Sequence, residues 1–153
     1  MKISEKAPMF SLQNKEGRTV SLNDFSGKWV VLYFYPKDNT PGCTAEAVEF
    51  SATHDQFLDN NSIVIGISTD SVSSHLKFSE KYQLQIELLS DPDHTVCELY
   101  GVWQKKKFIG KEYMGISRTT FLINPEGIIE HVWENVKVSG HAKIVETKVC
   151  SLK

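Results

Sequence analysis

Residues 29–46 read WVVLYFYPKDNTPGCTAE. The opening WVVLYFY is a continuous apolar run rich in β-branched and aromatic residues, which is typical of a strand covered on both faces. Pro36 ends this run, and the residues after it are polar and turn-forming. Thr40 followed by Pro41 has the features of an N-cap and a first helical residue. The stretch therefore predicts a central strand, a loop and a helix, with Cys43 in the loop or in the first helical turn.

Further strands are expected on either side of this stretch. Ser62–Ser68 has the same continuous apolar character. Thr119–Ile123 and Ile128–Trp133 flank a turn-like Asn-Pro-Glu-Gly and are expected to pair as a hairpin. Met9–Leu22 contains two short alternating pieces around Asn14–Gly17, which predicts a peripheral hairpin. Helices are expected from Pro41 to about Leu58, from Ser73 to about Leu84, from Asp93 to about Tyr100, and from about Ser139 onward.

This order of elements indicates the fold class. Strands that first alternate with helices and then end in a hairpin favour an α/β fold with a mixed central sheet flanked by helices. The crossover strands are expected to be parallel and the hairpin strands antiparallel, and a thioredoxin-like arrangement fits this order. The chain has 153 residues and shows no repeat or linker, so residues 1–153 are expected to form a single domain.

The composition argues against several other classes of protein. A net charge of -2 and a pI near 6.2 leave no basic excess with which to bind nucleic acid. The N-terminal sequence MKISEKAPMF lacks the apolar core of a signal peptide, and no window approaches the ~20 apolar residues of a membrane span. We expect a cytoplasmic protein without nucleic-acid or membrane partners. The five histidines show no metal-binding spacing, so neither metal nor cofactor is expected.

The three cysteines, at positions 43, 97 and 150, are too far apart for a CxxC or zinc motif. Cys43 follows the predicted central strand, where α/β proteins usually build their sites. Near a helix N-terminus its sulfur would face unpaired backbone N–H groups, which stabilise a thiolate. The alternative is that Cys43 is a small buried structural residue. Its polar neighbours argue against this, because they indicate that Cys43 does not sit in a sealed core.

These residues resemble a known family. The spacing Pro36-x-x-x-Thr40-x-x-Cys43 is similar to the active-site loop of the peroxiredoxins. FYPKDNTPGCTAE (34–46) and SDPDHTVCELYGVW (90–103) resemble the bacterioferritin-comigratory, or PrxQ, subgroup in particular. GISRTTFLINPEG (115–127) is similar to the strand that carries the family's arginine, with Arg118 in the arginine position. The resemblance extends over essentially the whole chain.

The resemblance implies a thiol-dependent peroxidase that reduces hydrogen peroxide and organic hydroperoxides through a sulfenic acid at Cys43. It also implies that Thr40 orients the peroxide, that Arg118 stabilises the thiolate and the peroxide oxygens, and that Pro36 limits the access of water. Glu46 belongs to the same string, but the helix dipole explains it equally well, so no catalytic role is assigned to it. The subgroup favours a monomer and leaves a weak dimer open.

The sequence departs from the subgroup at the resolving cysteine. Val48 occupies the position five residues after Cys43, and Phe78–Tyr82, a second known location, also lacks a cysteine. Cys97 lies in an apolar helical pattern and is expected to be buried, whereas Cys150 lies near the frayed end of the chain. Both stay open as candidate resolving residues. The leading expectation is a 1-Cys cycle in which thioredoxin, glutaredoxin or a small thiol reduces Cys43 directly.

Two other functions compete with this one. A disulfide oxidoreductase on the same fold requires a second cysteine at CxxC spacing, which the residues around Cys43 do not provide. A peroxide sensor or redox relay would pass the oxidation of Cys43 to a partner protein. The missing resolving cysteine keeps that alternative open. Turnover distinguishes the two, because a sensor stops once its cysteine is oxidised.

Overall fold

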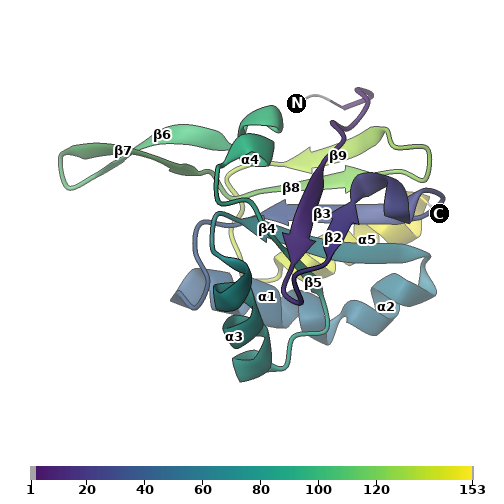
Figure 1. The fold of residues 1–153 in the computed structure, drawn as a ribbon. Helices are drawn as coiled ribbons and strands as arrows, with labels where there is room; N and C mark the ends of the chain where they lie inside the picture. Colours follow the sequence, from purple (N-terminus) through teal and green to yellow (C-terminus); the bar gives the residue numbers. More distant parts are fainter. Residues whose placement is uncertain (1–2, 153) are drawn as a thin grey trace.

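The computed structural model describes residues 3–152. A seven-stranded sheet in the order β2-β1-β5-β4-β3-β8-β9 forms its centre (Figure 1). The strands are β1 (Ser11–Asn14), β2 (Thr19–Ser21), β3 (Trp29–Phe34), β4 (Ser62–Ser68), β5 (Glu87–Ser90), β8 (Thr119–Ile123) and β9 (Ile129–Trp133). β3, β4 and β5 are parallel, whereas the β1–β2 and β8–β9 pairs are antiparallel. The predicted α/β fold with a mixed sheet is confirmed.

Helices cover the two faces of the sheet unequally. They are η1 (Leu22–Phe25), α1 (Pro41–Ala52), α2 (His54–Asp59), α3 (Val72–Tyr82), α4 (Thr95–Leu99) and α5 (His141–Leu152). Val31 and Tyr33 of β3 pack with residues of α1, α2, α3 and α5. On the other face, Leu32 and Phe34 pack with residues of α4 and the N-terminal segment. All of β3 is buried, as its apolar run predicted.

Most predicted elements are found where they were expected. β4 and β8 have the predicted bounds, β8 and β9 form the predicted hairpin, and the β1–β2 hairpin lies at one edge of the sheet. The single helix expected from Pro41 to about Leu58 is wrong, because the helix is broken at Thr53. The Thr53 hydroxyl donates to the carbonyl oxygens of Glu49 and Phe50, at 3.0 and 3.1 Å. Such side-chain bonds compete with the helical ones.

Sequence reasoning missed β5 and a second hairpin, made of β6 (Trp103–Phe108) and β7 (Lys111–Ile116). This hairpin projects from the body of the molecule (Figure 1). Its turn contains Ile109 at a φ of 49° and Gly110 at 74°, where Asn-Gly is the usual signal. The lysine-rich strand and the unusual turn explain why the pattern was missed. No helix within residues 3–152 is long and apolar enough to cross a bilayer.

Candidate active site

Cys43 is the third residue of α1, at the end of the loop that leaves β3. Thr40 is the N-cap, with φ -98° and ψ 155°, and Pro41 follows as the first helical residue, as predicted. The Thr40 hydroxyl does not cap the helix but donates to the carbonyl oxygen of Lys37 at 2.8 Å. The backbone N–H of Thr44 bonds the Thr40 carbonyl oxygen at 2.8 Å. The N–H groups of Gly42 and Cys43 therefore precede the helix's own hydrogen bonds.

The side chain of Cys43 is buried, with 1% of the residue exposed. The expectation that its polar neighbours keep it out of a sealed core is wrong. Cys43, Ala47 and Phe50 lie at i, i+4 and i+7 of α1, so they share the helix face that packs against the sheet. The polar residues before Cys43 belong to the loop and not to this face. Pro36, two residues after the end of β3, is half-buried.

Arg118 lies against Cys43 because of strand pairing. Thr119, the first residue of β8, is paired with Phe34, the last residue of β3. Arg118 therefore lies at the end of β3 from which the loop leads to Cys43. Its Nη2 donates to the Cys43 sulfur at 3.3 Å, and its Nη1 donates to Glu46 Oε1 at 2.6 Å. A charged, multidentate donor thus contacts both groups.

Glu46, to which sequence reasoning assigned no role, belongs to this cluster. It lies one helical turn after Cys43, and only 1% of it is exposed. Burial raises the pKa of Glu46 to about 7, although the guanidinium of Arg118 opposes the shift. Its second carboxyl oxygen has no hydrogen-bond partner within residues 3–152. The sequence signal was its i+3 position relative to a cysteine, which places both side chains on one helix face.

The electrostatics keep a positive charge beside the sulfur. Burial alone would lower the pKa of Arg118, but Glu46 and Cys43 more than offset this effect, so its pKa is raised. Lys106 of β6 is a further cation, close enough to interact electrostatically with Arg118 and Cys43. Burial and Arg118 lower its pKa, and Cys43 acts in the opposite direction. The arrangement is suited to stabilising negative charge on sulfur and on an oxygen that approaches it.

The structure places Cys97 apart from Cys43. Cys97 is completely buried and packs with Phe34 and Tyr100 in the core on the opposite face of the sheet. Burial, followed by the nearby Asp91 carboxylate, raises the pKa of the Cys97 thiol far above its ordinary value. The sheet separates the two sulfurs, so they do not meet in this fold.

Cys150 is exposed on α5 and lies near the other end of the sheet. Its sulfur accepts a hydrogen bond from Asn60 Nδ2 at 3.2 Å, and the next residue, Asn61, accepts one from the backbone of Trp29 at the start of β3. Cys43 follows the opposite end of β3, and six residues of strand span about 20 Å. A disulfide requires Cα atoms within about 7 Å of each other. Cys150 therefore cannot pair with Cys43 of the same chain in this conformation.

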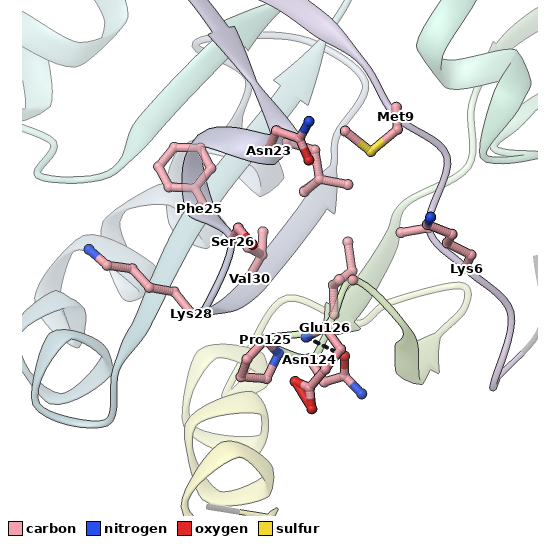
Figure 2. A pocket seen from close by; sticks show the side chains of 14 residues that line it. Lys6, Met9, Asn23, Phe25, Ser26, Lys28, Val30, Asn124, Pro125 and Glu126 are labelled. Carbon is pink, nitrogen blue, oxygen red and sulfur yellow. Dashed lines mark hydrogen bonds between the residues drawn. The ribbon is translucent and has the colours of Figure 1, made fainter.

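Two other features lie away from the Cys43 sulfur or have their polar groups engaged. A pocket of about 280 Å³ lies between η1 and the turn that follows β8, with Asn23, Lys28 and Asn124 among its lining residues (Figure 2). It is at the end of β3 opposite to Cys43. Asp38, Asp70 and His75 bring three metal-type donor atoms within 4.8 Å of one another. Each of them is engaged in hydrogen bonds with its neighbours.

A cysteine at the start of a helix, held by an arginine on a thioredoxin-like sheet, defines a cysteine-based redox enzyme. The AhpC/TSA family profile matches residues 3–132. Peroxiredoxin Bcp of Bacillus subtilis is 49% identical over 141 residues, covering 92% of this chain and 90% of that protein. Peroxiredoxin Bcp of Escherichia coli K12 is 46% identical over 145 residues, covering 95% and 93%.

Solved structures agree with these relatives. A PrxQ mutant from Xylella fastidiosa superposes with a TM-score of 0.94 at 38% identity, covering 99% of this chain and 96% of that one. The bacterioferritin comigratory protein of Xanthomonas campestris, described for its alkyl peroxide reduction activity, gives a TM-score of 0.89 at 39% identity, covering 93% and 90%. The chain belongs to the AhpC/TSA family, in its Bcp or PrxQ group of peroxiredoxins. It is a thiol-dependent peroxidase.

Proposed function

We propose that the chain, acting as one domain, reduces hydrogen peroxide and organic hydroperoxides through Cys43 in a 1-Cys cycle. The observation that carries the proposal is the contact of 3.3 Å between Arg118 Nη2 and the Cys43 sulfur at the start of α1. The helix N-terminus and the guanidinium both favour the thiolate, which is the nucleophilic form. The named activity of the Xanthomonas campestris relative supports the inclusion of alkyl peroxides among the substrates.

In the first step, a sulfur lone pair of the Cys43 thiolate attacks one peroxide oxygen and the O–O bond breaks. The leaving oxygen departs with the bonding electron pair and takes a proton, to give water or an alcohol. The sulfur is oxidised by two electrons and becomes a sulfenic acid. The peroxide is reduced by the same two electrons, so no cofactor is needed.

The neighbouring residues position the peroxide and stabilise its charge. Because the Thr40 hydroxyl hydrogen is donated to Lys37, its oxygen is left to accept a hydrogen bond from the peroxide. Arg118 and the first N–H groups of α1 stabilise the charge that develops on the oxygens. Pro36, half-buried at the start of the loop, limits the access of water to the sulfur.

The second half of the cycle requires an external thiol. Its sulfur attacks the sulfenic acid and releases water, and a further thiol then releases Cys43 from the mixed disulfide. The positions of Cys97, on the opposite face of the sheet, and Cys150, near its other end, support this route. Thioredoxin, glutaredoxin or a small-molecule thiol is the expected reductant.

The test is steady-state consumption of hydrogen peroxide and cumene hydroperoxide with thioredoxin and its reductase, or with dithiothreitol. Cys43→Ser should abolish turnover, whereas Cys97→Ser and Cys150→Ser should retain it. If either of these two loses thioredoxin-linked turnover but keeps the dithiothreitol reaction, that cysteine resolves the sulfenic acid and the 1-Cys cycle is wrong. Turnover retained in Cys43→Ser would overturn the role of Cys43.

A peroxide sensor or relay is the second candidate. The observation that favours it is the isolation of the buried Cys43 from the other two thiols, because an oxidised cysteine without a resolving partner can pass its oxidation to another protein. Such a protein would consume a single equivalent of peroxide in the presence of thioredoxin or dithiothreitol. Sustained consumption excludes this alternative.

A further inference from the structure

In the loop between β3 and α1, Asp38 makes the buried contacts with the protein body, and Asn39 adds exposed ones with Lys81 and Tyr82 of α3. The side chain of Asp38 is buried, with 3% of it exposed. The hydroxyls of Tyr35 and Ser74 donate to its carboxylate at 2.6 and 2.8 Å. His75 Nδ1 lies 2.7 Å from the same group. Its backbone N–H donates to Asp70 at 2.8 Å, so both the main chain and the side chain of Asp38 are held.

His75, the partner of Asp38, is completely buried in α3. Its Nε2 lies 2.9 Å from the carbonyl oxygen of Leu89 in β5. A carbonyl oxygen only accepts, so Nε2 must carry a hydrogen. The short contact between Nδ1 and the Asp38 carboxyl group requires one more hydrogen between them, on either partner. The contact is therefore a hydrogen bond, either between a charged imidazolium and a carboxylate or between the two neutral groups. Because both side chains are buried, water cannot take the place of either partner if the bond is lost.

This network fixes the loop relative to the sulfur. Asp38 lies five residues before Cys43, in the same loop as Pro36 and Thr40. Through His75 it is joined to α3 and β5, and through Asp70 to the segment that follows β4. Of these elements, β5 is a strand of the same sheet as β8, the strand that Arg118 precedes. The loop and Arg118 thus have a common rigid support.

We propose that Asp38 and His75 are positioning residues, which hold the loop before Cys43 in the conformation that peroxide attack requires. The inference rests on the proposed role of Cys43, which is 1% exposed and which a bulky thiol cannot reach in this conformation. Loss of the pair should slow the attack on peroxide and, at the same time, make the sulfur easier to reach. A residue that only stabilises the fold would not change these two rates in opposite directions.

The experiment compares the wild type with Asp38→Ala, His75→Ala and the double variant. The rate constant for oxidation of reduced Cys43 by hydrogen peroxide is expected to fall by on the order of 10²-fold, as for a small misplacement of reacting groups. Alkylation of Cys43 by a bulky maleimide, followed by mass spectrometry of its peptide, is expected to rise about tenfold, the effect of losing one charge-assisted bond. Because the residues act as a pair, the double variant should differ little from the more damaging single one.

Asn124→Ala is the control, because it removes side-chain hydrogen bonds of 3.0 and 2.9 Å with the backbone N–H groups of Glu126 and Ile128, in the turn after β8 and away from the loop. It should lower the melting temperature but leave both rates unchanged. If the Asp38 and His75 variants melt lower and yet keep both wild-type rates, the inference is overturned. If the wild type itself does not react with peroxide, the proposed function fails, and the alkylation rates still decide whether the pair holds the loop in this conformation.

Discussion

Arg118 Nη2 lies 3.3 Å from the sulfur of Cys43, although the two residues are 75 positions apart in the sequence. The antiparallel register of β3 and β8 places them together, because Thr119 is opposite Phe34. A shift of this register by one residue would turn every β8 side chain to the other face of the sheet. The site therefore depends on strand pairing as much as on the cysteine loop.

Arg118→Met should lower the rate of peroxide attack on Cys43 by about 10²- to 10³-fold, because it removes a charged donor of comparable length. Stopped-flow oxidation of the reduced protein measures this rate. Arg18→Met is the control, since Arg18 is exposed in the turn between β1 and β2 and should leave the rate unchanged. A fall below tenfold for Arg118→Met would contradict its role in stabilising charge.

Gly42→Ala tests the contact between Arg118 and the Cys43 sulfur by displacing the guanidinium instead of removing it. A Cβ added at Gly42 would lie 3.3 Å from Arg118 Nη2, so the guanidinium must shift by a few tenths of an ångström. We expect the rate of peroxide attack to fall by up to about tenfold, since the alignment of reacting groups is sensitive to such shifts. Stability should not fall, because alanine is favoured over glycine in a helix by up to about 1 kcal/mol. A lower melting temperature with an unchanged rate would refute this prediction.

The sequence predicted those parts of the fold whose signals are local. The run at Trp29–Phe34 identified the buried strand, and Thr40 with Pro41 identified the start of α1. The hairpin of β6 and β7 was missed because Ile109-Gly110 does not resemble a usual turn and its strand carries consecutive lysines. The pairing of β6 with β7 holds this element together, and neither strand shows the apolar alternation by which a half-buried strand is recognised.

The site was predictable in part for the same reason. The position of Cys43 in the first turn followed from its neighbours, but its burial did not, because the packed face of α1 appears only when i, i+4 and i+7 are considered together. Glu46 was left without a role, since a carboxylate near a helix start has a sufficient local explanation, and no local signal distinguished Asp38. Their contacts with Arg118 and His75 join segments that are distant in sequence.

The three thiols should differ in reactivity in the native, reduced protein. Cys150 is exposed and should be labelled quickly by a small disulfide reagent, whereas the buried Cys97 should be labelled only as fast as the protein unfolds. Cys43 should react at an intermediate rate, set by opening of its loop. Peptide mass spectrometry after timed quenching separates the three. Rapid native labelling of Cys97 would show that the core around α4 opens independently.

Glu46→Gln should change how stability depends on pH. The pKa of Glu46 is raised from 4.5 to about 7 in the folded protein, mainly by burial. Between these values the folded state binds a proton that the unfolded state has lost, so wild-type stability falls as pH rises. Glutamine does not titrate. The variant should therefore gain on the wild type in urea unfolding between pH 5 and pH 8, by up to about 3 kcal/mol. If its advantage shrinks as pH rises, the ion pair with Arg118 outweighs burial and keeps Glu46 charged throughout this range.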